Sequence, residues 1–348
     1  MHMADALISP TVGFTMMAFT AGLAAYSIKK IQNDMDEKKV PLMGVLGAFV
    51  FAAQMINFTI PATGSSGHIG GGILLAALLG PYAGFLAMAS ILLIQALFFG
   101  DGGLLAYGCN LFNMGFYTCF IAYPYIYKLI TQKGLNSNNI FVATMISAVI
   151  GLQLGAFSVV LETLFSVKTE LPFNTFAMLM QPIHLAIGIV EGLVTASIIN
   201  FVFKARPELL EKVAAGEAFG GLYLNRILKG FLVSAVIVGG ALSWFASGNP
   251  DGLEWSMEKA TGTTELSASD GMHQLFATIQ EKTAFLPDYD FKATEEKSAS
   301  EDESTWSVVN IGTSVSGLVG GAMTFALAGF IGLIIKLFNR REDVSASK

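Results

Sequence analysis

The amino-acid sequence predicts an all-α membrane protein that crosses the bilayer several times. Of its 348 residues, 53% are hydrophobic and only 13% are charged, whereas soluble domains carry roughly 25% charged residues. Apolar runs near the roughly 20 residues of one crossing recur along most of the chain. The 37 glycines suit helices that pack closely in lipid. We therefore expect a multi-pass protein of the cell membrane, with the lipid bilayer as its solvent.

The apolar runs place the spans in order along the chain. They cover about 7–28, 41–60, 69–80, 83–99, 104–127, 140–163, 174–203, 228–247 and 307–336. The third run is short for a full crossing, so we expect it to be tilted, or re-entrant and shielded by protein. The last run has a small residue at every fourth position from Gly312 to Ala328, which permits close packing of another helix.

Lysine and arginine residues indicate the orientation. They follow the first, fifth and last spans and fill the connection between the seventh and eighth. If the third and fourth runs both cross, all these basic groups lie on one side, which is the cytoplasm. The N-terminus and the 61–68 loop then face outside, and the C-terminus is cytoplasmic. The first five residues contain no Lys or Arg, unlike a signal peptide, so we expect Met1 and the first helix to be retained.

Three parts follow from this pattern. Residues 1–203 form a membrane domain, which we call the front part, and 204–227 form a cytoplasmic connector of helix-like composition. Residues 228–348 form a two-span back part with the extracytoplasmic loop 248–306. The loop is rich in Asp and Glu. It is either a solvated, partly flexible excursion or a segment that attracts cations or contacts the front part. His273 stands alone in this loop, so we do not expect it to bind metal.

The N-terminus is the first candidate metal site. The Met1 amine, the His2 amide nitrogen and the His2 imidazole can chelate one ion through fused rings, and His68 would complete a plane of four nitrogens. Such a plane favours Ni(II) or Cu(II), whereas zinc prefers a tetrahedron and cobalt fits the plane less well. Ser65 and Ser66 can hydrogen-bond groups around the ligands. The alternative is that His2 belongs to a simple tail and His68 to the membrane interface.

Polar residues within the spans form a second set of candidates. Asn110 and Asn113 share one helix face, as do His184 and Glu191, and Glu162 lies late in its span. Ionisable groups inside a membrane are costly and often functional, although hydrogen bonding between helices is the simpler interpretation. An intramembrane enzyme that uses Glu162, His184 and Glu191 therefore stays open, as does a metal sensor or accessory protein that does not transport.

ATP-driven transport would need a partner. The sequence contains no G-x-x-x-x-G-K-[ST] phosphate loop, so this chain does not hydrolyse ATP by that route. We expect it not to be an enzyme, and no nucleic-acid partner is expected.

Several motifs together resemble one transporter family. Residues 1–10, MHMADALISP, look like the "MHxxDxxxSP" start of the CbiM/NikM substrate-capture subunits of energy-coupling-factor (ECF) transporters. Residues 67–72 resemble that family's second-histidine loop, and 110–115 and 184–192 resemble its helix motifs. The match covers about 1–203. The part beyond resembles the small NikN subunit, and 249–255 is similar to the "PDGLE" signature of the nickel version.

This resemblance implies the fold, the ligands and the partners. It implies an ECF S-component-like bundle of about seven helices and a two-helix C-terminal part. It also implies a four-nitrogen site from the Met1 amine, the His2 amide and ring, and His68. The substrate would be Ni(II), with Co(II) as the alternative, captured from outside. A transmembrane T subunit and cytoplasmic ATPase subunits would drive uptake. Residues 262–306 resemble nothing in the family.

Overall fold

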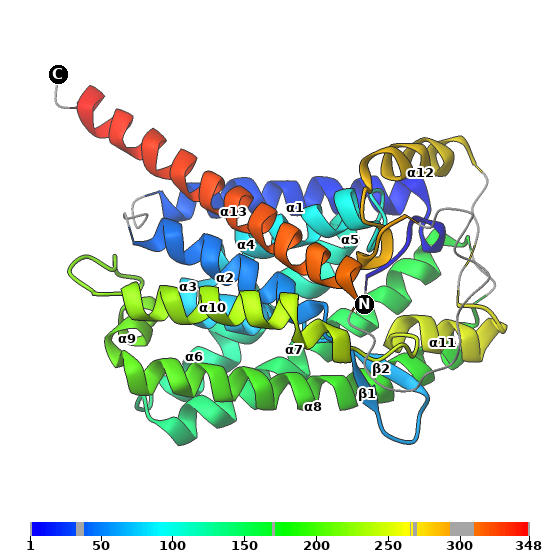
Figure 1. The fold of residues 1–348 in the computed structure, drawn as a ribbon, viewed down its shortest axis with the longest axis horizontal. Coiled ribbons are helices and arrows are strands. Elements are labelled where there is room, and N and C mark those ends of the chain that lie inside the picture. The colour runs from blue at the N-terminus through cyan, green and yellow to red at the C-terminus, as the bar shows by residue number, and fades with distance from the viewer. Residues whose placement is uncertain are drawn as a thin grey trace.

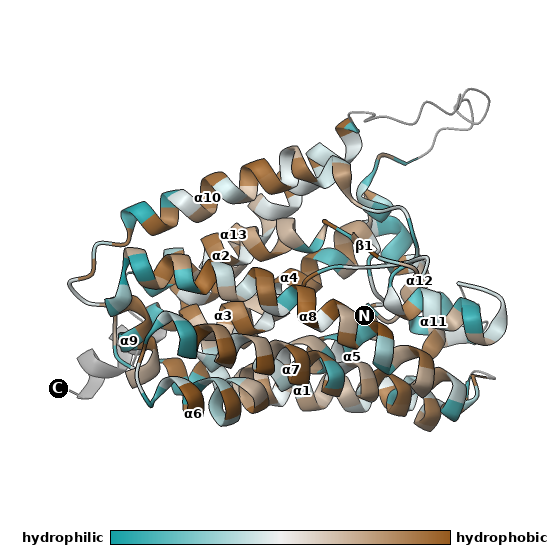
Figure 2. Cartoon of the chain, turned by 90° about the horizontal axis from the view of Figure 1, so that it is seen from below, coloured by the Kyte–Doolittle hydropathy of each residue, from teal (hydrophilic) through white to brown (hydrophobic). Residues whose placement is uncertain are grey.

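The long helices of this protein are apolar enough to cross a membrane. The computed structural model describes residues 2–32, 38–168, 171–264, 266, 270–292 and 310–346 (Figure 1). Within these residues, five helices meet that requirement: Pro10–Ile31, Pro81–Phe99, Ser137–Ser166, Phe173–Ala205 and Ile311–Leu337. The prediction of an all-α, multi-pass membrane protein is confirmed. Hydrophobic residues follow these helices, and hydrophilic ones gather toward their ends (Figure 2).

The front part is a bundle that begins with the short turn η1 (Asp5–Leu7). Its helices are α1 (Pro10–Ile31), α2 (Lys39–Gln54), α3 (Gly72–Leu79), α4 (Pro81–Ile94) with its extension η2 (Gln95–Phe99), α5 (Tyr107–Leu111), η3 (Phe112–Tyr127), α6 (Lys128–Thr131), α7 (Ser137–Ser166) and α8 (Phe173–Ala205). The Ser9 side chain accepts from the Val12 N–H and caps α1, and Asn136 caps α7 in the same way.

The second and third predicted spans are shorter in the structure than the apolar runs. The second was expected to reach residue 60, but α2 ends at Gln54 and is followed by a hairpin of β1 (Phe58–Ile60) and β2 (Ser65–Gly67). Ala62 and Gly64, both with positive φ, turn the chain between these strands, where apolar content alone suggested a continued helix. The third span is the eight-residue α3, about 12 Å long, and all its residues are buried. It is therefore shielded by protein, which agrees with one of the two expected alternatives.

The back part packs on the front part through its last helix. The connector forms α9 (Pro207–Ala215). The elements that follow are α10 (Asn225–Gly240), η4 (Leu242–Phe245), α11 (Gly252–Thr261), α12 (Gly271–Thr283), η5 (Pro287–Tyr289) and α13 (Ile311–Ala346). A Cβ at Gly320 would lie 2.1 Å from the Phe51 ring of α2, and Thr324 packs against Gly47. The predicted close-packing face of the last span is confirmed.

The ends of the bundle differ in what they carry. The N-terminus, the β hairpin, α11 and α12 lie together at one end, and α9 lies at the other (Figure 1). We call the first of these the pocket end. At the opposite end, Lys29 and Lys30 lie in the last turn of α1, Lys128 begins α6, and Arg206 directly follows α8. The boundaries of the three predicted parts, and the side of the membrane that each end faces, stay predictions.

Candidate metal centre

The N-terminal segment is held by hydrogen bonds to the turn and helix that follow α4. The Met3 N–H donates to the Asn110 side-chain oxygen at 2.7 Å, and the Asn110 amide donates to the Met3 carbonyl at 3.1 Å. The Asp5 carboxylate accepts from the Ala106 N–H at 2.9 Å. Because Met3 is fully buried, these bonds fix the backbone that carries His2.

A second network fixes the loop that carries His68. The Glu191 carboxylate accepts from the Gly71 N–H at 2.9 Å, and the Gln54 amide donates to the carbonyl of the preceding glycine at 2.8 Å. The Gln95 amide donates in turn to the Gln54 side-chain oxygen at 2.9 Å. These side chains come from α8, α2 and η2, so three separate elements set the path of the chain after His68.

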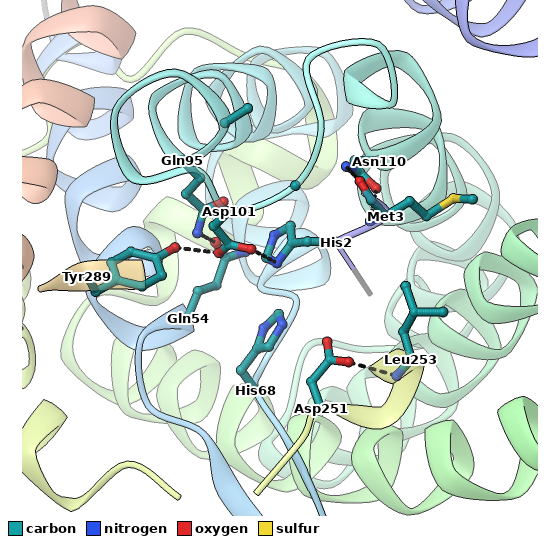
Figure 3. Close-up of polar contacts among 12 residues, drawn as sticks. His2, Met3, Gln54, His68, Gln95, Asp101, Asn110, Asp251, Leu253 and Tyr289 are labelled. Atoms are coloured by element: carbon teal, nitrogen blue, oxygen red, sulfur yellow. Dashed lines mark hydrogen bonds and ion pairs between the residues drawn. The ribbon is translucent and has the colours of Figure 1, made fainter. Parts of the chain in front are cut away.

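His2 and His68 bring their imidazole rings together. The ring centroids are 5.1 Å apart and the planes are within 7° of parallel (Figure 3). The His2 Nδ1 lies 3.1 Å from an Asp101 carboxylate oxygen, and the His2 Nε2 is buried without a hydrogen-bond partner among the described residues. Imidazole nitrogens bind metal ions at about 2 Å, so one ion can bind both rings once they rotate.

The turn that carries Asp101 depends on a glycine. Gly102 has a φ of +79°, and a Cβ there would lie 2.8 Å from the Asn110 amide nitrogen and 3.4 Å from the His2 Cβ. A larger residue would strain this backbone and press on both neighbours. The glycine therefore lets Asp101 and His2 approach each other closely.

Burial and the neighbouring charges set the protonation of this site. Burial, together with the nearby His2, lowers the pKa of His68 to about 3, so its imidazole is neutral at pH 7. Burial alone would raise the pKa of Asp101, but His2 and the Tyr289 hydroxyl outweigh it and lower this pKa to about 2. A neutral imidazole is the form that binds metal, and an ionised carboxylate lies beside it.

A cavity of about 470 Å³ opens beside both histidines. Carboxylates from three regions of the chain line it, and none of its described lining residues is a lysine or arginine. These carboxylates belong to Asp101, Asp251, Glu254 and Asp288. Burial would raise the pKa of Asp251, but the hydrogen bond from the Glu254 N–H and the nearby His68 help to lower it below its ordinary value. The cavity therefore favours a cation.

The segment Asn249–Trp255 is built around a helix cap. One Asp251 oxygen accepts from the Leu253 and Glu254 N–H groups at 2.8 and 2.9 Å, and the Glu254 carboxylate accepts from the Asp251 N–H at 2.9 Å. This capping box starts α11 beside the cavity. The Trp255 indole donates to a carbonyl at the tip of the β hairpin at 2.9 Å. The segment thus ties α11 to the hairpin that precedes His68.

Ser65 and Ser66 bind this same segment. The Ser66 hydroxyl donates to the Asn249 carbonyl at 2.8 Å, and the Ser66 N–H donates to the Pro250 carbonyl at 2.8 Å. The Ser65 hydroxyl lies 3.4 Å from the Pro250 carbonyl. Both serines therefore join the hairpin to the back part, one layer further from the histidines than the sequence suggested.

His184 lies beneath the same segment. A Cβ on Gly252 would come within 3.0 Å of the His184 ring, so glycine permits the close approach of α11 to α8. The His184 Nδ1 faces the Met180 carbonyl at 2.8 Å, and its Nε2 has no hydrogen-bond partner among the described residues. His184 thus supports the start of α11 and has no contact with Glu191 or Glu162 in the hydrogen-bond network.

Besides the contacts at α11, three side chains of α12 and η5 reach the front part. The His273 Nε2 lies 3.0 and 2.9 Å from two carbonyl oxygens of the N-terminal segment. The Gln280 amide donates to two main-chain carbonyls around η2, at 2.9 and 2.7 Å. The Tyr289 hydroxyl donates to Asp101 at 2.5 Å. Of the two interpretations of this loop, contact with the front part therefore holds for α12 and η5; residues 293–309 lie outside the described chain.

The predicted polar residues do not all meet at one place. Asn110 fixes the His2 segment and Glu191 fixes the His68 loop, whereas Asn113 donates to Glu162 at 2.8 Å in a separate buried pair. Glu162, His184 and Glu191 each have a different partner, so they form no common centre for an intramembrane enzyme.

The ligand prediction extends beyond the described residues at one point. Met1 lies outside them. Within the described chain, no three His, Cys, Asp or Glu side chains group as a metal site.

Sequence patterns do not identify Asp101 or Tyr289. The only signal for Asp101 is a single carboxylate between two glycines directly after an apolar span. Tyr289 lies in the acidic loop, 188 residues further along the chain, and only folding brings the two together.

Comparisons with known proteins agree with this architecture. Residues 2–209 match the family model of the cobalt uptake substrate-specific transmembrane region, CbiM, and residues 225–337 match the PDGLE domain. The fused nickel transport protein NikMN of Rhodobacter capsulatus is 30% identical over 289 residues, which cover 78% of this chain and 80% of the relative. A candidate fused nickel transport protein NikMN of Archaeoglobus fulgidus is 35% identical over 215 residues, covering 62% of this chain and 70% of that relative.

Two solved structures share the fold of about three fifths of this chain. The crystal structure of a truncated transition metal transporter is 32% identical, with a TM-score of 0.52, and the match covers 59% of this chain and 99% of that one. A second transition metal transporter structure is 33% identical, with a TM-score of 0.53 over 60% of this chain and 94% of that one.

Proposed function

This chain belongs to the cobalt uptake substrate-specific transmembrane (CbiM) family, and we propose that it is the subunit that captures Ni(II) for an ECF-type importer. The ligands would be the Met1 amine, the His2 amide nitrogen and imidazole, and the His68 imidazole. The observation that carries this proposal is the parallel pair of His2 and His68 rings beside the N-terminus, at the wall of a carboxylate-lined cavity.

The cavity accounts for the approach of the ion. Four carboxylates on its wall attract a divalent cation, and no described lining residue opposes them with a positive side chain. The ion then exchanges its water for nitrogen ligands deeper in the wall. Because the amine and amide nitrogens must lose protons on binding, affinity falls in acid.

Binding requires the His2 ring to turn. The nitrogen that closes a chelate ring with the residue's own amide is Nδ1, which faces Asp101 in this structure. A half-turn about the Cβ–Cγ bond frees Nδ1 and places Nε2 where Cε1 was, next to the carboxylate. The Nε2–H then donates a hydrogen bond to the Asp101 carboxylate, which orients the ring, as carboxylates commonly do for metal-binding histidines.

Nickel is the metal that this ligand set favours. Four nitrogens in a plane suit Ni(II), and Co(II) is the competing substrate. Two of the relatives, both described as fused NikMN proteins, are named as nickel transport proteins, which also favours nickel.

The proposal includes an orientation and partners. The pocket end would face outside and the C-terminus the cytoplasm, because the basic residues gather at the opposite end. A transmembrane T subunit and cytoplasmic ATPase subunits would supply the energy for release, since this sequence has no phosphate loop. The back part would stabilise the loaded site through α11, α12 and η5.

The test is to extend the chain ahead of Met1. One added residue turns the Met1 amine into an ordinary amide and leaves both histidines in place. Ni(II) affinity, measured by calorimetry on the purified full chain, should fall by at least about 100-fold. The same residue added after Lys348 is the matched control and should change nothing. Unchanged Ni(II) affinity in the N-terminally extended chain would refute the chelate.

A further inference from the structure

A second cavity lies at the end of the bundle opposite the histidines, between α8 and α10. Its volume is about 730 Å³. Both helices present residues spaced one turn apart, so each contributes a single continuous face. The lining residues used here are Phe201, Arg206, Arg226, Gly230, Phe231 and Ser234. Phe49 of α2 closes the floor against Phe231, with ring centroids 5.1 Å apart. We call this cavity the α8–α10 groove.

The groove has one charged end and an apolar body. Arg206 directly follows α8, and Arg226 is the second residue of α10, so both guanidinium groups lie where these antiparallel helices end. No hydrogen bond or ion pair involves either guanidinium within the described part of the chain. Phe201 is 74% exposed at the edge of the groove, which suits contact with lipid.

The depth of the groove fits one leaflet of a membrane. Eight residues separate Arg226 from Ser234, which corresponds to about 12 Å along the helix. The hydrocarbon core is about 30 Å thick, so one leaflet is about 15 Å deep. With the arginines at the level of the headgroups, the apolar body of the groove lies at the depth of the acyl chains.

We propose that the α8–α10 groove binds one anionic phospholipid. Its phosphate would bind Arg206 and Arg226, and one acyl chain would lie between the helices against Phe231. Basic pockets between membrane helices recognise anionic headgroups in this way, and two guanidinium groups can hold one phosphate through several charged hydrogen bonds. The lipid would bridge α8, in the part that matches CbiM, and α10, in the part that matches PDGLE.

The experiment measures lipid retained by the purified full chain. The protein is exchanged into detergent micelles that contain equal amounts of phosphatidylglycerol and phosphatidylcholine, and bound lipids are counted by native mass spectrometry. The wild-type chain should retain one phosphatidylglycerol in preference to phosphatidylcholine. The R206Q/R226Q variant should lose that preference, with retention reduced by roughly tenfold or more.

A second variant tests the groove separately from the charge. A Cβ on Gly230 would meet nothing within 4 Å, so Gly230→Trp fills the groove without a clash. It should displace the lipid although both arginines remain. Two variants on α1 are the matched controls. K29Q/K30Q removes two positive charges at the same end of the bundle as the groove, and Gly22→Trp adds a large side chain where a Cβ also meets nothing within 4 Å. Both controls should retain the lipid.

Four results would overturn the proposal. Equal retention of the two lipids would show no headgroup recognition. Normal retention in Gly230→Trp would show that the acyl chain lies elsewhere, and loss in either control would show a general effect of the substitution. Displacement by free inorganic phosphate would mean that the arginines bind phosphate without the acyl chain.

Discussion

The contact between Tyr289 and Asp101 should control metal affinity from a distance. Tyr289 reaches Asp101 from the acidic loop at 2.5 Å, and the other Asp101 oxygen lies 3.1 Å from the His2 Nδ1. Tyr289→Phe removes one hydrogen bond to a charged group, which is usually worth about 1.5–3 kcal/mol. It keeps the ring that stacks on Phe99 with centroids 5.1 Å apart. Packing should therefore survive while Asp101 loses one of its two partners.

The expected loss of Ni(II) affinity is roughly 10-fold for Tyr289→Phe and up to about 100-fold for Asp101→Asn, the range for groups that orient metal ligands. Because Tyr289 acts through Asp101, Tyr289→Phe should add little in the Asp101→Asn background. Calorimetric titration of the four proteins gives the coupling directly. Tyr125→Phe, at a residue that is 66% exposed, is the matched control. Fully additive losses, or no loss in Tyr289→Phe alone, would refute this chain of contacts.

Three other predictions concern the same end of the bundle. Gly252→Leu should destabilise the packing of α11 by about 1–3 kcal/mol, because the new side chain overpacks against His184. Proteolysis of α11 should be faster in this variant but not in Gly248→Leu, where a Cβ meets nothing within 4 Å. Equal cleavage of the two variants would contradict the prediction. The His273 ring faces acceptors on both nitrogens, and although burial opposes it, the hydrogen bonds to Asp270 and the N-terminal segment raise its pKa. The protonated ring therefore stabilises the fold fully below about pH 6.5, and this stabilisation is lost as pH rises through the raised pKa. Amide exchange in α12 should accelerate at alkaline pH in the wild type but not in His273→Gln. Slow exchange in the wild type at every pH would contradict this prediction. The pKa of His68 is lowered to about 3, so as pH falls below about 6.5 the unfolded chain takes up a proton before the folded chain does. The free energy of unfolding of the metal-free protein should therefore decline between about pH 6.5 and 3, and much less in His68→Ala. Equal declines in the two proteins would exclude His68 as the cause.

The signature segment of the back part has a physical explanation in this structure. Asp251 and Glu254 cap α11, and Gly252 allows the helix to approach His184 on α8. Trp255 extends the contact to the hairpin. A motif read in the sequence only as a resemblance is thus a docking element that joins the two parts beside the candidate site.

The sequence by itself determined the membrane class, the long helices and the two histidines. Apolar runs report burial in lipid directly, because each span must satisfy its own backbone and expose apolar side chains. The same rule failed at residues 58–67, where a hairpin is shielded at the pocket end and apolar content no longer signals a helix. Likewise, the small residues of the last span predicted its close contact, because packing in lipid depends on side-chain size.

Only the tertiary structure decided what surrounds the histidines. Tyr289 meets Asp101, Ser66 meets Asn249, and His273 meets the N-terminal segment, across separations of 183 to 268 residues. No periodicity links residues so far apart, because such contacts follow from how the helices pack and where the loop folds back. The ligand candidates are thus visible as local motifs, whereas their supporting contacts form only on folding: Asn110 and Glu191 act within the front part, and Tyr289 and His273 reach it from the back part.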